Sequence, residues 1–490
     1  MLVEDHKRAF AAVGEQSPSS AQEILAQLDN SHLSRFHLKA MITSGMGFFT
    51  DAYDLFIISV VNSILIPLWH LGALEIALIN SVSLLAAAFG SLLFGRLADR
   101  IGRHGIYGMT LLILAVGAIL SALSPNIYWL LGFRLIMGLG IGGDYPLSAT
   151  LMSEYANRKD RGKLITMVFS MQGLGLIMGP LVAIVLLTSG FSQDLTWRLM
   201  LGFGAIPALA TFYLRRKIAE TPRFTLMMNG DLNTATQKAK HATPNKTNKT
   251  SQQGVAPRAK QQAQKSGLAL LLSRRYLRWI IGTAGAWFLL DIAYYGSTTS
   301  NTLILKMLNP HADQVTNMVY MLLIFLIAAL PGYILAALTI DRMGRKTIQC
   351  MGFGVMALTY TLLALVPALS SLTIPFLSLY GIGYLFTEWG PNTTTFVYPA
   401  EIFSVRVRSS AHGIAAGLGK VGAFVGAFAF PYLLVQFHIQ GTMAFAAVVA
   451  LLGLLLTFFT LPEPNGRSLE EISGDLDFLS PPEKQLEQVR

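Results

Sequence analysis

The chain has 490 residues, of which 53% are apolar and only 13% are charged, whereas soluble domains carry about 25% charged residues. So few charges exclude a soluble enzyme, because a soluble protein of this length needs a polar surface. A single cysteine, Cys350, excludes an intramolecular disulfide and cysteine-based zinc or iron–sulfur sites. The net charge of +10 would suit nucleic-acid binding only if the basic residues gathered on one surface.

Apolar segments long enough to cross a bilayer recur along nearly the whole chain. A hydrocarbon core about 30 Å thick needs about 20 apolar residues in a helix. We therefore predict an all-α membrane protein with about twelve spanning helices, with approximate limits 38–68, 74–94, 106–123, 127–152, 164–188, 197–214, 277–305, 316–340, 347–366, 372–397, 409–435 and 442–461. The first of them is too long for the apolar core of a cleavable signal peptide.

Lysine and arginine fall on alternate loops and on both tails, and the opposite loops carry almost none. By the positive-inside rule, both termini and the long central linker are cytoplasmic, in a plasma or inner cell membrane. This distribution explains the net positive charge, so we expect a lipid bilayer and no nucleic acid as partner. The predicted organisation is a cytoplasmic segment (1–37), a six-helix bundle (38–214), a largely disordered linker (215–276), a second bundle (277–461) and a tail (462–490).

The two bundles carry repeated motifs. Asp-Arg-x-Gly-Arg at 99–103 recurs at 341–345, and the pair Glu154 and Arg161 recurs as Glu401 and Arg408. Asp51 in the first span matches Asp291 in the seventh. These offsets of about 240–247 residues predict duplicated halves, which in secondary transporters rock against each other around a central site.

The repeated cytoplasmic charges are candidates for a conformational gate. Carboxylates and arginines there can pair with the ends of neighbouring helices in one rocking state and separate in the other. Gly102 permits a tight turn beside them. The alternative is that these charges only set the topology. The predicted gating residues are Asp99, Arg100, Arg103, Glu154, Arg161, Asp341, Arg342, Arg345, Glu401 and Arg408.

Neither a phosphate-binding Gly-x4-Gly-Lys-Ser/Thr motif nor a catalytic nucleophile with its base is found in the sequence. We therefore expect no enzyme, no catalytic residue, no metal and no cofactor, and a transport cycle driven by an ion or substrate gradient.

A few ionisable residues lie within the predicted spans, where each costs about 2.5–3.5 kcal/mol and is a functional candidate. An excess of carboxylates over bases would suit proton coupling, because desolvation and like charges favour their neutral forms. The alternative is a buried ion-pair network that only holds the helices together. The residues are Asp51, Asp54, Arg134, Asp144, Asp291, Glu388 and Lys420.

Two groups of motifs carry a family resemblance. The sequence GRLADRIGR at 95–103 resembles the signature of the major facilitator superfamily, and GGDYPLSAT at 142–150 resembles the phosphate:proton symporters within it, the group of fungal and plant high-affinity phosphate transporters. Stretches in both halves agree with that family, namely 47–54, 171–173, 287–291, 390–396 and 399–420. The resemblance implies twelve helices in two six-helix halves around a central cavity.

It also implies a function and a site: symport of inorganic phosphate with protons by alternating access, in a chain that acts as a monomer. The family's phosphate contacts correspond here to Tyr145, Gln172, Trp287, Asp291, Tyr295 and Asn392, with Lys420 as the nearby cation; its proton carriers correspond to Asp51, Asp54 and Asp144. The chemistry is consistent, because dihydrogen phosphate offers hydroxyl donors that a carboxylate such as Asp291 can accept, whereas sulfate offers none.

Two features depart from the family pattern. Glu388 stands where the family has asparagine, four residues before Asn392, and is a candidate modifier of the site. Residues 297–301 are more hydroxylated than usual. Alternative functions are therefore a carrier of the same superfamily for an organic anion, a phosphorylated metabolite or a sugar, and a phosphate sensor of the same fold.

Overall fold

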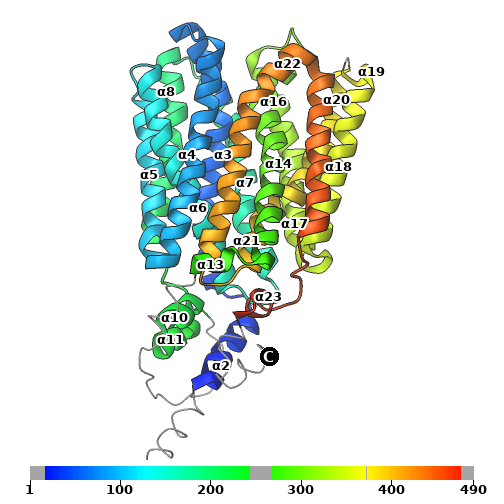
Figure 1. Ribbon diagram of the computed structural model, residues 1–490. Coiled ribbons are helices and arrows are strands. Elements are labelled where there is room, and N and C mark those ends of the chain that lie inside the picture. The colour runs from blue at the N-terminus through cyan, green and yellow to red at the C-terminus, as the bar shows by residue number, and fades with distance from the viewer. Residues whose placement is uncertain (1–16, 243–266, 371, 476–490) are drawn as a thin grey trace, which may run out of the picture.

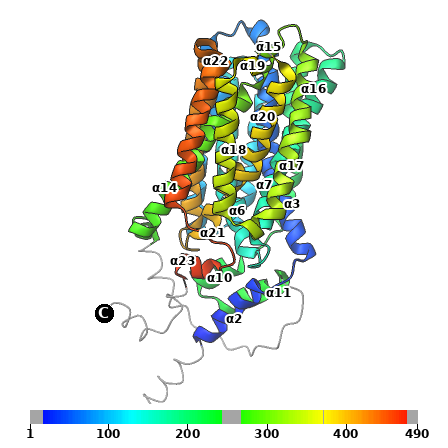
Figure 2. The same cartoon turned by 90° about the vertical axis from the view of Figure 1, so that its right-hand side faces the viewer.

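The computed structural model describes residues 17–242, 267–370 and 372–475. Within these ranges every regular element is helical, and the long helices form one upright bundle with short helices at one end (Figures 1 and 2). The predicted all-α class is confirmed. The first half comprises α3 (Arg35–Trp69), α4 (Ala73–Ile101), α5 (His104–Ala122), α6 (Ile127–Tyr155), α7 (Arg161–Thr188), α8 (Gln193–Phe203) and α9 (Ala205–Arg215).

The second half repeats this arrangement with more interruptions. Its elements are α14 (Arg274–Thr299), α15 (Asn301–Leu308), α16 (Gln314–Ile324), η1 (Phe325–Ala329), α17 (Leu330–Met343), α18 (Arg345–Leu365), α19 (Pro367–Ser370), α20 (Thr373–Thr387), η2 (Glu388–Asn392), α21 (Thr393–Ile402) and α22 (Arg408–Thr460). The helix α22 is two spans, because His438 leaves the helical region at φ 56° and the chain turns back there (Figure 1).

Eight helical segments are long and apolar enough to cross a bilayer by length and composition. Dividing α22 at His438 and adding α6, α14 and the segment α20–η2–α21 gives twelve spans in the described part of the chain. Large apolar side chains cover their outer faces; Phe89, Val185, Ile327, Leu365 and Phe459 are 62–74% exposed. An exposed apolar belt of this kind suits lipid and not water.

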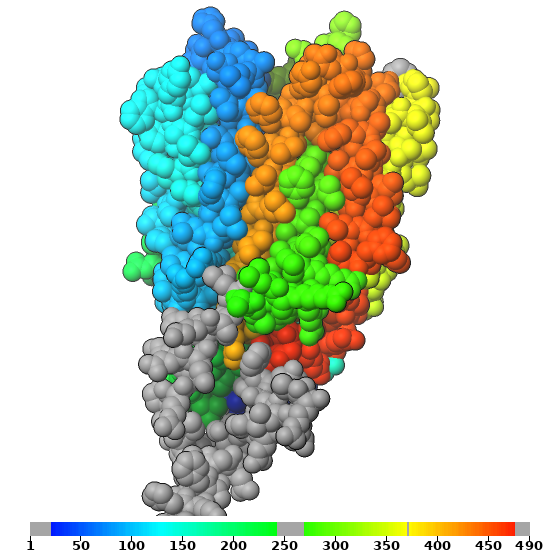
Figure 3. Space-filling model, in the orientation of Figure 1, coloured from blue at the N-terminus to red at the C-terminus, as the bar shows by residue number. Residues whose placement is uncertain are grey.

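The halves meet along two helix pairs, α4 with α22 and α7 with α17. On the face drawn in Figure 3, α4 and the first part of α22 lie against each other. Small residues allow this approach, since a Cβ on Gly95 would stand 2.5 Å from the carbonyl oxygen of Ser409. The repeated motif also has a repeated geometry: Gly102 and Gly344 end α4 and α17 at φ 100° and 87°.

Short helices lie below one end of the bundle, which is the predicted cytoplasmic end (Figure 1). They are α2 (Ser17–Asp29), α10 (Pro222–Asn229), α11 (Leu232–Ala242), α13 (Gly267–Leu271) and α23 (Leu469–Ser473). The predicted disordered linker is thus helical in its described first part. The reason is a stripe of small residues: Ala235 and Ala239 of α11 are fully buried against Leu25 and Leu28 of α2. Residues 243–266 lie outside the described ranges.

Candidate functional site

A lysine surrounded by phenols and carboxylates lies in the middle of the bundle. Lys420 Nζ of α22 donates a hydrogen bond to Tyr145 Oη of α6 at 2.8 Å and another to Tyr295 Oη of α14. Tyr145 Oη donates in turn to Asp51 Oδ2 of α3 at 2.6 Å, and this oxygen lies 3.9 Å from Lys420 Nζ. All four residues are at most 4% exposed. Two helices from each half therefore contribute to one buried cluster, which brings together four of the predicted site residues.

Asp291 adds a free acceptor to this cluster. It lies on α14 one turn from both Trp287 and Tyr295, and it is 1% exposed. The positive charge of Lys420 attracts its carboxylate, yet its Oδ2 has no hydrogen-bond partner. Leaving a buried carboxylate oxygen unpaired is costly. The atom is therefore available to a ligand that can donate a hydrogen bond.

A second polar group joins the halves beside η2. Tyr333 Oη of α17 donates to Gln172 Oε1 of α7 at 2.7 Å and accepts from Asn392 Nδ2 at 2.9 Å. Asn392 Nδ2 also donates to Glu388 Oε2, one turn earlier. The helix is broken between them, since Gly390 has φ −97° and ψ −112° and Pro391 follows. Interrupted helices commonly present site residues in transporters. The structure brings together Gln172 and Asn392, two predicted site residues, whereas Tyr333 is a member that the sequence did not reveal.

Aromatic rings close these clusters toward the predicted cytoplasmic end. Phe169 and Phe396 stack with centroids 4.6 Å apart, and Phe48 packs edge-on against Phe396 at 5.0 Å. Each ring lies three or four residues along its helix from a candidate contact. Trp287 and His412 extend the layer, with ring centroids 5.6 Å apart. In this state the clusters are thus shielded from the predicted cytoplasm.

The other two predicted proton carriers are each paired with an arginine. Asp54 is bound through both carboxylate oxygens by Arg134, at 3.3 and 3.2 Å. Asp144 is bound by Arg215 at 2.9 Å and by a second, shorter bond. These proton-carrying roles stay predictions, and the pairs favour a structural role. Arg215 was not predicted from the sequence as a site residue, because it is the last residue of α9 and a basic residue at the end of a span indicates membrane topology.

Beyond the aromatic layer, carboxylates of each half cap helices of the other. Asp99 of α4 accepts hydrogen bonds from the amides of Ser409 and Ser410, at 3.2 and 2.6 Å, at the start of α22. Asp341 of α17 accepts from the amides of Gly162 and Lys163, at 3.0 and 2.7 Å, at the start of α7. A carboxylate at a helix N-terminus is stabilised by unpaired amides and the helix dipole. The two caps are related by the duplication.

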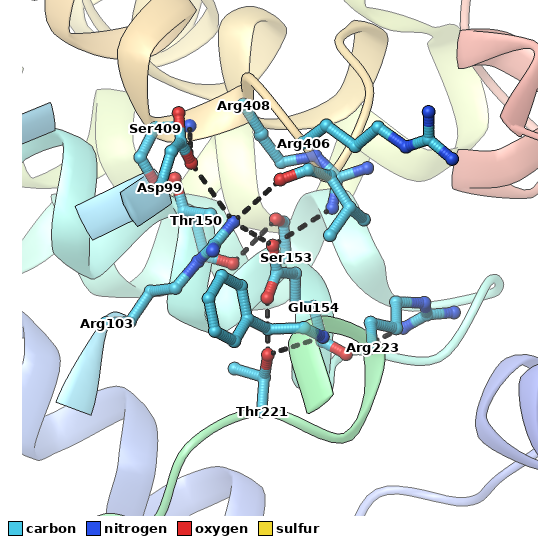
Figure 4. Close-up of polar contacts among 12 residues, drawn as sticks. Asp99, Arg103, Thr150, Ser153, Glu154, Thr221, Arg223, Arg406, Arg408 and Ser409 are labelled. Atoms are coloured by element: carbon cyan, nitrogen blue, oxygen red, sulfur yellow. Dashed lines mark hydrogen bonds and ion pairs between the residues drawn. The ribbon is translucent and has the colours of Figure 1, made fainter. Parts of the chain in front are cut away.

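Two buried glutamates join the arginines of both halves in the same way. Glu154 binds Arg103 of its own half at 2.9 Å and Arg408 of the other at 3.4 Å, as Figure 4 shows together with Asp99. Glu401 binds Arg345 of its own half at 2.7 Å and Arg161 of the other at 3.0 Å. Eight of the ten predicted gating residues thus bridge the halves directly or through these glutamates.

The remaining two predicted gating residues, Arg100 and Arg342, do not take part. Both are exposed, and neither makes an ion pair within the described part of the chain. Adjacent positions on a helix face in different directions, so Asp99 and Asp341 point into the interface while the next residue points away. For these two arginines the alternative interpretation, a topological charge, is the better one.

Arg223 of α10 ties the short helices to this network. Its guanidinium donates to the carbonyl oxygen of Glu154 at 2.7 Å and to Glu470 of α23 at 3.0 Å, and it also binds Asp29 of α2. Burial alone would raise the pKa of Glu470, but the charges of Arg223 and Arg408 together with hydrogen bonds outweigh burial and hold this pKa below its usual value. The N-terminal helix, the linker and the C-terminal helix are therefore joined at one residue.

Comparison with known proteins agrees with this architecture. A family model described as sugar (and other) transporter matches residues 36–476. The chain is 38% identical to the probable inorganic phosphate transporter 1-6 of Arabidopsis thaliana, over 95% of this chain and 98% of that protein. It is also 38% identical to the low affinity inorganic phosphate transporter 1 of Petunia hybrida, over 92% and 95%.

Among solved structures, the major facilitator proton:xylose symporter XylE bound to 6-bromo-6-deoxy-D-glucose has the same fold. The TM-score is 0.75 at 19% sequence identity, over 90% of this chain and 99% of that one. Fold, family model and relatives agree along nearly the whole length. The chain is therefore a member of the major facilitator superfamily, and within it belongs to the family of the inorganic phosphate transporters.

Proposed function

We propose that this protein carries inorganic phosphate across a membrane together with protons, by alternating access. The observation that carries the proposal is the unpaired Oδ2 of Asp291, buried beside Lys420 between the halves. A lysine attracts an anion, and a free carboxylate oxygen suits an anion that still has a hydroxyl to donate. Dihydrogen phosphate combines both properties. The relatives named as inorganic phosphate transporters support the same substrate.

The remaining contacts fit a small tetrahedral anion. Tyr145, Tyr295, Trp287, Gln172 and Asn392 can each donate a hydrogen bond to a phosphate oxygen, and all are at most 2% exposed. Burial of this degree leaves little room for a sugar or a large phosphorylated metabolite in the closed state. Phosphate would exchange its contacts with water for these donors.

Protons would be carried on Asp51. It shares Lys420 with Asp291, whereas Asp54 and Asp144 have arginines of their own. A proton on Asp51 would release Lys420 to the anion, so phosphate and proton would stabilise each other. Asp291 would accept the phosphate hydroxyl through its free oxygen.

The network around Glu154 and Glu401 would be the cytoplasmic gate, closed in this state. We place both termini in the cytoplasm and the protein in a plasma or inner cell membrane, acting as a monomer. Opening to the cytoplasm would break, in one step, the hydrogen bonds and ion pairs that Asp99, Asp341, Glu154 and Glu401 make to the other half.

Removing both gate glutamates should shift the protein toward a state open at this end. In Glu154→Gln with Glu401→Gln, four arginines each lose a glutamate partner, and Arg103 and Arg345 keep only Asp99 and Asp341 of their own half. We expect the open population to rise at least about tenfold, or about 1.4 kcal/mol. Spin labels on the exposed positions Arg100→Cys and Arg342→Cys, in a Cys350→Ser background, report the separation of the halves. Identical distance distributions with and without the glutamine pair would contradict the gate.

Asp51→Asn should weaken the coupling of phosphate transport to the proton gradient. An amide does not titrate, so downhill phosphate exchange should persist while accumulation driven by a pH gradient falls well below that of the wild type. Both are measured in proteoliposomes with labelled phosphate. Asp54→Asn is the comparison: it leaves Arg134 unpaired and should lower thermal stability. Asp51→Asn protein that concentrates phosphate on a pH gradient as strongly as the wild type would place the coupling of this proton elsewhere.

Titration calorimetry on the purified protein tests the substrate. We expect heat of binding with phosphate at acidic pH and at least about tenfold weaker binding of sulfate, which has no hydroxyl for Asp291. Equal affinity for sulfate, or binding of a sugar or an organic anion in its place, would contradict the proposal. Binding without any transport in proteoliposomes would favour a phosphate sensor.

A further inference from the structure

Glu388 is a second buried carboxyl group in the second half, and it differs from the others in having no basic partner. The side chain is fully buried, its Oε2 accepts from Asn392, and its Oε1 has no hydrogen-bond partner. The other fully buried glutamates of the described chain, Glu154, Glu401 and Glu470, are each held by arginine.

The groups that face Glu388 are phenols from every neighbouring helix. They are Tyr294 and Tyr295 of α14, Tyr333 of α17, Tyr360 of α18 and Tyr384 of α20. No cation faces it among the described residues. An ionised carboxylate in such surroundings is costly, so the neutral acid is favoured whenever a proton can reach it. Tyr294 Oη also has no hydrogen-bond partner, so its hydroxyl is free to exchange a proton.

Separate hydroxyl and amide groups lie on α20 and α14 between this carboxyl and α15, at the end of the bundle opposite to α10 and α11 (Figure 2). Tyr384 Oη lies 3.1 Å from Thr298 Oγ1, and Tyr380 Oη donates to Asn301 Oδ1 at 2.8 Å. Ser300 Oγ and Asn301 Nδ2 are buried and unpartnered. Polar groups of this kind can relay a proton toward a buried carboxyl where water molecules bridge them. The hydroxyl-rich stretch 297–301 thus acquires a role.

We propose that Glu388 is a second proton-binding site, loaded from the α15 end and emptied at the cytoplasmic end. The step is a protonation of the carboxylate by a proton from the outer solution, and its reversal when the gate opens. This inference rests on the proposed function, in which Asp51 carries the first proton. Each phosphate would then travel with two protons.

Asn392 connects this proton to the anion. An ionised Glu388 holds the amide of Asn392 through a charge-assisted hydrogen bond and repels an anion nearby. Protonation weakens that bond and removes the charge, so the amide of Asn392 becomes available to phosphate. Gln172 and Tyr333 share the same network and would move with it. Proton binding at Glu388 and phosphate binding would therefore favour each other.

The response of transport to membrane potential distinguishes one proton per phosphate from two. Dihydrogen phosphate moving with two protons carries one positive charge inward, whereas with one proton it carries none. In proteoliposomes of the full chain at equal acidic pH on both sides, an inside-negative potential of about 59 mV should raise phosphate accumulation about tenfold in the wild type. Glu388→Gln should transport phosphate without responding to the potential. Glu388→Asp, which still titrates, should respond, and Glu23→Gln on the exposed face of α2 is the matched control.

The outcomes are distinct. Wild-type protein that does not transport phosphate overturns the proposed function. Wild-type transport that ignores the potential, or a response that persists in Glu388→Gln, overturns the second proton site alone. A second measurement needs no variant and therefore still tests the proposal if the Glu388 variants do not fold. In wild-type protein with 13C-labelled glutamate, infrared spectra should contain the carbonyl band of one protonated glutamic acid at neutral pH. Absence of that band would contradict the proposal, since the other fully buried glutamates are ion-paired.

Discussion

Asp144→Asn should destabilise the protein by about 3–5 kcal/mol, the cost of leaving a buried arginine without its carboxylate. Arg215 is 1% exposed and is held between Asp144, the carbonyl oxygens of Thr43 and Ser44, and the ring of Tyr107. Its charge cannot reach solvent when Asp144 is neutralised. Unfolding of the purified protein, followed by heat or denaturant, measures the loss.

The double variant Asp144→Asn with Arg215→Gln is the control for this effect. It removes both charges, so it should be more stable than the single variant, by a coupling energy that a double-mutant cycle isolates. A single variant as stable as the wild type, but unable to accumulate phosphate on a pH gradient, would mean instead that Asp144 carries a proton.

Asp291→Asn should weaken phosphate binding at least about tenfold, or about 1.4 kcal/mol, with little change in stability. The amide removes a charged acceptor for the phosphate hydroxyl, and no protein donor depends on Oδ2. Titration calorimetry gives the affinity. Asp194→Asn, an exposed aspartate on α8, is the matched control and should bind like the wild type. Equal affinity in the Asp291 variant would remove Asp291 from the site.

Most of the architecture could be predicted from the sequence, because bilayer-length apolar segments and alternating basic loops are long-range patterns that survive errors of a few residues. The network of carboxylates and arginines that joins the halves was predictable for a different reason. Its motifs occur twice, and the duplication fixes which carboxylate of one half corresponds to which in the other, as with Asp99 and Asp341.

Contacts between single residues far apart in the chain were harder to predict. Tyr333 lies in an apolar span and has no motif around it, so its role as a bridge between Gln172 and Asn392 appears only in three dimensions. The helix α11 was missed because its buried face is made of alanines, which carry little hydrophobic signal. The four-residue spacing of Glu388 and Asn392 was evident from the sequence, whereas the non-helical backbone of Gly390 between them appears only in the structure.

Accumulation of labelled phosphate in proteoliposomes under an imposed pH gradient tests the central claim most directly. With the protein reconstituted and the outside made acidic, we expect phosphate to rise inside above its external concentration, and to leak back when a protonophore collapses the gradient. An internal concentration that never exceeds the external one, with or without the gradient, would contradict proton-coupled phosphate transport.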